Sequence, residues 1–260
     1  FKCVHSLEMF KKDNIIQFLY PKGTKDLFKD VFPIPAKLNI PEWYKDLKTS
    51  QEYVTIKSCI PFLDALTAGY ILRMPQDFHV KHNYVNKEGN RDSNFRFGFN
   101  DAGYGRLIER GINVNTKDRE THHPDQLGRE CPFHKKNKYL PYYKILNPFK
   151  IVTPPGYSCL FVPPLNNTDD RFNIISGLVD TDTFKPPINF PIIINGDKYP
   201  ELESTIKKGT PYVQVIPFKR ESWKMKMGEQ KDDNIITHLT IMKEVWNNYK
   251  NNLWSKKRWM

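Results

Sequence analysis

The stretch "FNIISGLVDTDTFKPPINFPIIIN" (residues 172–195) contains short apolar runs separated by Gly177, an Asp-x-Asp pair and a double proline. Short runs rich in β-branched residues and bounded by Gly or Pro predict β-strands. Prolines inside such runs are typical of sheet edges, bulges and tight corners. The stretch therefore predicts a mainly β fold of the α+β class, in which the aspartates Asp180 and Asp182 directly follow a strand.

Two neighbouring segments continue this pattern. "FKIVTPPGYSCLFVPPL" (residues 149–165) and "STIKKGTPYVQVIPFKRESWKMKMG" (residues 204–228) again alternate short apolar runs with Pro and Gly. Together with the first stretch they predict an antiparallel sheet core with proline-rich turns.

Beyond these segments the composition of the chain changes. Residues 113–139 are polar and almost without apolar periodicity, which is typical of a long loop. From Asp233 onward apolar residues recur at helical spacing, so an amphipathic C-terminal helix is expected. The predicted organisation has four parts: a β-rich N-terminal part (1–112) packed on the core, a polar loop excursion (113–144), the β core (145–228), and the C-terminal helix with a basic tail (229–260).

The tail itself combines basic and aromatic side chains, Trp254, Lys256, Lys257, Arg258 and Trp259. Such a tail can stack on nucleic-acid bases or bind an acidic surface. The alternative is a helix end in solvent, whose positive charge complements the helix dipole.

Composition limits the partners. The 260 residues carry 40 Lys and Arg against 29 Asp and Glu, a formal net charge of +11. This excess favours an anionic partner, which could be a nucleotide, nucleic acid or an acidic protein surface. No apolar run is long enough to span a membrane, so no membrane partner is expected. Four scattered cysteines suggest no disulfide scaffold and fit a reducing cytoplasm.

The polar loop carries candidate metal ligands. His123, Cys131 and His134 lie close together in sequence, and Cys131-x-x-His134 has a spacing compatible with zinc. His123-x-Asp125 is also similar to part of a facial triad of non-haem iron. The third interpretation is a loop of solvated histidines. No other cofactor is expected, although Mg²⁺ or Zn²⁺ would accompany an enzymatic role.

The three β segments resemble the dUTPase and dCTP deaminase superfamily, whose fold is the β-clip. In that family a PPG turn leads into a strand, a G-[VL]-I-D-x-D-Y strand follows, and a G-x-R-I-A-Q-[LM]-I strand comes last. Here the corresponding residues are Pro154-Pro155-Gly156, Gly177 to Asp182, and Gly209 to Ile216, and the likeness covers residues 151–218.

The resemblance implies roles for particular residues. Asp180 would activate water and hold a sugar hydroxyl, Asp182 would orient a metal or sugar, and Gln214 would lie near the phosphates. Catalysis by Asp180 would also require cationic partners for the phosphates, and the candidates are Lys207, Lys208, Lys219 and Arg220.

The chain departs from the family where the triphosphate is held. The family's Arg-Ser-Gly is replaced by Pro164-Leu165-Asn166, and Thr183 stands in place of the aromatic residue over the deoxyribose. The magnesium-linked aspartate of the family motif is Gly105 here. These differences make the resemblance a stronger indication of fold than of reaction.

A second resemblance covers most of the chain. "PIPAKLNIPEWYKDL" (33–47), "TPPGYSCLF" (153–161) and "GTPYVQVIPFKRESW" (209–223) look like an uncharacterised family of tailed phages and some bacteria. This implies a phage-related origin, with the protein in the cytoplasm of an infected host or in the virion. Since β-clip relatives are commonly trimers, a homo-oligomer such as a trimer is expected.

Three classes of function follow. The first is a non-catalytic β-clip protein, either a binding module or a structural protein associated with the virion. The second is a divergent dUTPase-like nucleotide pyrophosphatase with Asp180 as the base. The third is a metal-dependent enzyme built on the loop between His122 and His134.

Overall fold

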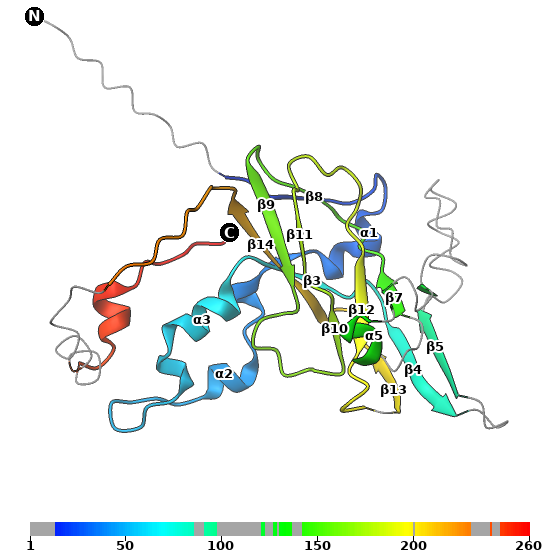
Figure 1. Ribbon diagram of the computed structural model, residues 1–260, viewed down its shortest axis with the longest axis horizontal. Helices are drawn as coiled ribbons and strands as arrows, with labels where there is room; N and C mark the ends of the chain where they lie inside the picture. The colour runs from blue at the N-terminus through cyan, green and yellow to red at the C-terminus, as the bar shows by residue number, and fades with distance from the viewer. Residues whose placement is uncertain are drawn as a thin grey trace, which may run out of the picture.

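The computed structural model confirms the expected mainly β character of the chain. Its strands form antiparallel sheets, and the helices are short (Figure 1). The structure describes these residues: 14–85, 91–97, 121–122, 127–128, 130–136, 142–199, 201–229, 240 and 245–260.

A five-stranded antiparallel sheet contains one strand from each of the segments 149–165, 172–195 and 204–228. Its strands, in spatial order, are β11 (Gly177–Val179), β9 (Tyr157–Val162), β14 (Pro211–Lys219), β3 (Tyr70–Arg73) and β2 (Ile34–Pro35). Strand β9 is central to the first three, because it pairs with β11 on one side and with β14 on the other. The strand after the PPG turn therefore lies between the Asp-x-Asp strand and the last strand.

Strand β14 is the longest strand of this sheet, and it is buried in its middle. Four consecutive residues of this strand are all buried: Tyr212, Val213, Gln214 and Val215. A strand with both faces covered loses the alternation of apolar and polar residues. The run "YVQV" therefore places the amide side chain of Gln214 in the interior.

The remaining strands form three smaller antiparallel sheets. Their spatial orders are β10–β12–β7–β6, β13–β4–β5 and β1–β8. The bounds are β10 (Phe172–Ile174), β12 (Phe190–Ile194), β7 (Tyr142–Ile145), β6 (Thr121–His122), β13 (Leu202–Ile206), β4 (Phe78–Val85), β5 (Arg91–Phe97), β1 (Gln17–Leu19) and β8 (Lys150–Val152).

The helical elements are short and lie mostly before the main strands. Prolines lie at the N-termini of two helices: Pro41 precedes α2, and Pro61 occupies the first turn of α3. The missing N–H of proline costs no hydrogen bond there, because the first N–H groups of a helix have no partner within it. No helix among the described residues is long and apolar enough to cross a membrane. The bounds are α1 (Lys25–Phe28), η1 (Lys29–Val31), η2 (Ala36–Leu38), α2 (Glu42–Asp46), η3 (Ile56–Ser58), α3 (Ile60–Thr67), α5 (Pro132–Lys136) and η5 (Tyr249–Leu253).

One hydrophobic core joins the sheets. Its buried members come from the five-stranded sheet and from the smaller sheets alike, and burial of this apolar surface is the main force that holds them together. The largest fully buried side chains are Tyr212, Phe78, Phe149, Phe161, Leu72, Met74, Ile145, Ile151, Ile192, Ile194 and Ile206.

The C-terminal part departs from the expected single helix. Residues 230–239 and 241–244, where most of that helix was predicted, lie outside the described residues. Residues 245–247 form a bend and turn, and Asn247 has a φ of 58°, in the left-handed region that interrupts a right-handed helix. The apolar stripe therefore does not continue as one helix to Leu253; it ends in the separate π-helical turn η5.

Candidate functional site

The two aspartates of the Asp-x-Asp pair lie in a turn that directly follows β11. The backbone N–H groups of Thr183 and Phe184 both donate to the carbonyl of Asp180, at 3.1 and 2.8 Å. The Thr183 hydroxyl donates to the same carbonyl at 3.2 Å. The pair therefore occupies a closed, hydrogen-bonded turn at the end of the strand.

Asp182 is held by the PPG turn and by an arginine. The backbone N–H of Gly156 donates to Asp182 Oδ2 at 2.8 Å, and Arg220 binds both carboxylate oxygens, with Nη1–Oδ1 at 2.9 Å and Nη2–Oδ2 at 2.5 Å. A two-pronged bond between guanidinium and carboxylate is among the strongest side-chain pairs. The Arg220 guanidinium and then the Gly156 amide hold the pKa of Asp182 well below its usual range. With only 7% of its side chain exposed, Asp182 is a structural anion.

Asp180 is more open but also bonded. The Ser158 hydroxyl donates to Asp180 Oδ1 at 2.6 Å, and Arg220 Nη1 lies 3.3 Å from the same oxygen. Its side chain is 55% exposed. Asp180 is therefore the member of the pair that solvent can reach.

Thr181, between the two aspartates, points into the protein. Its hydroxyl lies 2.7 Å from that of Thr153 and donates to Cys159 Sγ at 3.3 Å. Burial raises the pKa of the Cys159 thiol to about 11, and the Thr181 bond lowers it by less. A thiol with this pKa is protonated at neutral pH, so Cys159 is not an active nucleophile.

These contacts make one polar network, here called the Asp-x-Asp network: Asp180, Asp182, Arg220, Ser158 and Gly156. Arg220 also donates to the carbonyl of Tyr157 at 3.0 Å. The network joins the start of β9 to the ends of β11 and β14. Its charged groups are directed at one another, so it acts as a clamp between strands.

The low pKa of Asp182 makes this clamp dependent on pH. A carboxyl whose pKa is lowered by folding stabilises the protein above its unfolded pKa, here 3.8, and that stability is lost as the pH falls below this value. We expect Asp182→Asn to lower the free energy of unfolding at pH 7. The difference from wild type should shrink as the pH falls below about 4. Urea unfolding followed by circular dichroism at pH 7, 5, 3 and 2 measures this.

Glu52→Gln is the matched control, because Glu52 is exposed and makes no hydrogen bond among the described residues. It should leave the free energy of unfolding unchanged across the same range. If Asp182→Asn and Glu52→Gln gave the same pH profile, Asp182 would not carry the acid dependence.

Gln214, predicted to bind a ligand near phosphates, has a structural position. Its side-chain N–H group donates to the carbonyls of Ala65 and Ala68 at 2.9 and 2.6 Å. Its side-chain oxygen accepts from the N–H of Leu165 at 2.8 Å. Gln214 thus joins the end of α3 to the turn after β9, and a ligand role for it stays a prediction.

The structure does not bring Lys208 and Arg220 together. Lys208 lies in the turn before β14 and Arg220 follows β14, whose nine residues at a rise of about 3.3 Å separate the two by roughly 25 Å. The N–H of Lys208 donates to Asp77 at 2.8 Å, and its Nζ lies 3.3 Å from Asp30. The two cations therefore cannot grip the same phosphate group.

The predicted metal site is described only in part. His123 lies outside the described residues, while Cys131 directly precedes α5 and its carbonyl accepts the N–H of His134 at 2.9 Å. His134 is buried in α5. In the part of the chain that the structure describes, no group of three or more His, Cys, Asp or Glu residues could hold a metal ion.

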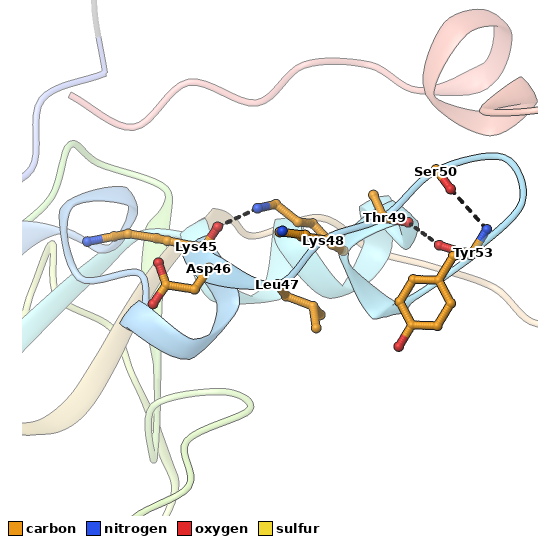
Figure 2. A pocket seen from close by; sticks show the side chains of 8 residues that line it. Lys45, Asp46, Leu47, Lys48, Thr49, Ser50 and Tyr53 are labelled. Carbon is orange, nitrogen blue, oxygen red and sulfur yellow. Dashed lines mark hydrogen bonds between the residues drawn. The ribbon is translucent and has the colours of Figure 1, made fainter.

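A surface hollow lies elsewhere, in the loop after α2 (Figure 2). The loop is closed by its own bonds: the N–H of Tyr53 donates to the Ser50 hydroxyl at 3.0 Å, and Lys57 Nζ donates to the carbonyl of Lys45 at 2.5 Å. The hollow, of about 660 Å³, contains none of the predicted site residues. It is lined by Lys45, Asp46, Leu47, Lys48, Thr49, Ser50, Tyr53 and Lys57.

No family model matches the sequence, and no curated protein matches it. What the structure establishes is a mainly β protein with antiparallel sheets, whose Asp-x-Asp pair is closed by an arginine.

Sequence reasoning identified the aspartates and Arg220 but not their mutual bonds. It treated Arg220 as a phosphate partner, whereas the structure places it on Asp182. It also missed the bond from Ser158 to Asp180, because no motif marks a hydroxyl that faces an aspartate on the neighbouring strand. The usable signal was Gly156, since a PPG turn leaves a backbone N–H free to bind an anion.

Proposed function

We propose that the protein is a non-catalytic, phage-related binding or structural protein with a β-clip core. The observation that carries this proposal is the closed Asp-x-Asp network. A general base requires a carboxylate facing a substrate, and triphosphate chemistry requires cations free to stabilise charge. Here Arg220 is already bound to Asp182, and Lys208 is remote from Asp180.

The arrangement of strands supports the β-clip part of the proposal. The three segments that resemble the dUTPase superfamily become neighbours in one sheet, as β11, β9 and β14. The bond between Gly156 and Asp182 links two of the resembling motifs directly. A protein that shares the fold of the dUTPase superfamily but not its reaction would keep these motifs close together, with Arg220 bound to Asp182 and not to a phosphate.

An exposed segment after β14 supports a role in assembly. Residues 221–229 run away from the sheet without regular structure (orange in Figure 1), and Trp223, Met225 and Met227 are 87%, 90% and 82% exposed. Lysines alternate with these apolar side chains. Exposed apolar side chains grouped in this way mark surfaces that contact other proteins. A homo-oligomer, such as the trimer expected from the resemblance, would provide one such contact.

One observation favours the alternative, a dUTPase-like pyrophosphatase. Asp180 remains more than half exposed, next to a hydroxyl and an arginine. If Arg220 exchanged Asp182 for a phosphate, Asp180 would be placed to activate water. This second candidate is tested by the same experiment as the first.

The test is hydrolysis of deoxynucleoside triphosphates with Mg²⁺, measured as pyrophosphate release by the purified protein. We expect no release above background from the wild type, and none from Asp180→Ala. The physical reason is that Arg220, the guanidinium next to Asp180, is already bound to Asp182.

Asp46→Ala is the control for protein quality, because Asp46 is an exposed residue of α2 outside the network. Pyrophosphate release that Asp180→Ala abolishes and Asp46→Ala retains would replace the non-catalytic proposal with the pyrophosphatase.

A further inference from the structure

A cleft lies beside the PPG turn, and no member of the Asp-x-Asp network lines it. It has a volume of about 510 Å³, within the range of sites for small molecules. Three separate parts of the chain enclose it: the segment before β1, the five-stranded sheet with the turn before β9, and the last residues of the tail. Its lining consists of Asn14, Ile15, Ile16, Tyr70, Thr153, Pro154, Tyr157, Pro217, Arg258, Trp259 and Met260.

The tail is fixed against the protein rather than frayed in solvent. Trp254 Nε1 and Lys257 Nζ both donate to Asp64 Oδ2, at 2.9 and 2.7 Å. The Tyr70 hydroxyl donates to the carbonyl of Met260 at 3.1 Å. In Figure 1 the C-terminus accordingly returns to the region of β9 and β14. The tail therefore forms a positioned wall of the cleft.

The other walls are largely aromatic. Tyr70 and Tyr157 are partly buried and come from two strands of the same sheet, while Trp259 comes from the tail. The rings of Tyr70 and Trp259 meet edge to face, with centroids 6.4 Å apart and an angle of 78°. Together with Pro154 these side chains offer flat, apolar surfaces that suit a planar ring.

One positive charge at the cleft is not used within the described part of the protein. Arg258 makes no hydrogen bond or ion pair among the described residues, whereas Lys257 beside it is paired with Asp64. A guanidinium next to aromatic walls can pair with a carboxylate or phosphate through two parallel bonds.

We propose that this cleft binds a small molecule with a flat aromatic ring and an anionic group, the ring against Trp259 and Tyr157 and the anion on Arg258. The proposal rests on the binding role proposed above, but it does not involve the Asp-x-Asp network. The shared chemistry could come from a nucleoside monophosphate or from an aromatic carboxylate, and the experiment separates these sources.

Isothermal titration with four probes tests the proposal: AMP, adenosine, indole-3-acetate and inorganic phosphate. We expect AMP, indole-3-acetate or both to bind. Adenosine, which lacks the anion, and phosphate, which lacks the ring, should bind at least about tenfold more weakly, since stacking and charge each contribute on this scale. AMP alone would indicate a phosphate ester, and indole-3-acetate alone a carboxylate.

Variants assign the binding to the cleft. Trp259→Ala should lower the affinity for the bound probe about tenfold. Arg258→Gln should lower the affinity for AMP to that for adenosine. Trp43→Ala is the matched control, because Trp43 is a 40% exposed tryptophan of α2 that does not line the cleft. Urea unfolding of each variant confirms that it is folded.

Two results would overturn the proposal: no heat of binding from AMP or from indole-3-acetate, or the same affinity for the probe in Trp259→Ala and Trp43→Ala. Neither result bears on catalysis, because pyrophosphate release is measured separately. Conversely, hydrolysis through Asp180 together with no binding at the cleft would overturn both proposals by distinct readouts.

Discussion

Replacing Gly69 by alanine is expected to lower the free energy of unfolding by about 3 kcal/mol or more, enough to unfold a marginally stable domain. Gly69 is buried between α3 and β3 with a φ of 65°. A Cβ there would lie 2.0 Å from the carbonyl oxygen of Val215 and 3.2 Å from Cα of Ile216. Both neighbours are backbone atoms of β14, so no side chain can move aside.

The expected loss combines two effects. A side chain at positive φ costs on the order of 1 kcal/mol, and the clash must push β3 away from β14. Gly69 also accepts a hydrogen bond from Ala36 N at 2.9 Å, so a shift would disturb the chain next to β2. Urea unfolding followed by circular dichroism measures the change.

Two glycines provide matched controls. Gly156→Ala has a positive φ of 85° but open space around the Cβ, so it should show the backbone cost alone. Gly177→Ala has neither positive φ nor a neighbour within 4 Å, so its stability should be close to that of the wild type. Gly69→Ala no less stable than Gly156→Ala would show that β3 and β14 do not approach as closely as described.

Gln214→Met should lower the free energy of unfolding by about 2–4 kcal/mol, the second largest effect we expect. The substitution keeps the length of the side chain but removes every hydrogen bond that the amide makes. The carbonyls of Ala65 and Ala68 and the N–H of Leu165 would then lose their partner. Leaving buried polar groups unpaired costs more than the bonds contribute when intact.

The same variant distinguishes a structural from a ligand-binding glutamine. Gln214→Met should strongly lower the free energy of unfolding measured with urea. Gln17→Met, at an exposed position of β1, should leave it unchanged. A Gln214→Met protein as stable as the wild type, but unable to bind a nucleotide that the wild type binds, would support the role implied by the dUTPase resemblance.

Local patterns of the sequence predicted several elements well. Residues 157–162, 177–179 and 190–194 are strands, as the short apolar runs between Gly and Pro indicated. Residues 58–74, in which apolar residues recur at helical spacing before a strand-like run that ends at Pro75, contain α3 and β3. These signals are reliable because strand and helix periodicity, Pro and Gly depend only on neighbours along the chain.

The candidate site was predicted less completely. The aspartates stand where the sequence placed them, at the end of a strand, but their state depends on distant residues. Gly156 and Asp182 are far apart in sequence, and Arg220 comes from a third segment. The sequence around an arginine does not show whether its guanidinium is free to bind a phosphate or already binds a carboxylate.

The tail shows the same limit. Its basic and aromatic composition was compatible with stacking on bases or with a frayed end. Trp254 and Lys257 nevertheless bind Asp64 in α3, which precedes Trp254 by 190 residues in the sequence. The break at Asn247 was also hidden, because the apolar stripe continues through it.

The sequence by itself determined the mainly β class, the positions of the principal strands and the placing of Asp180 and Asp182 after a strand. Tertiary structure alone decided that β9 lies between β11 and β14, that Arg220 forms an ion pair with Asp182, and that the tail lines a cleft. The physical reason is that strand pairing and ion pairing join residues distant in sequence, so their energies depend on the whole fold.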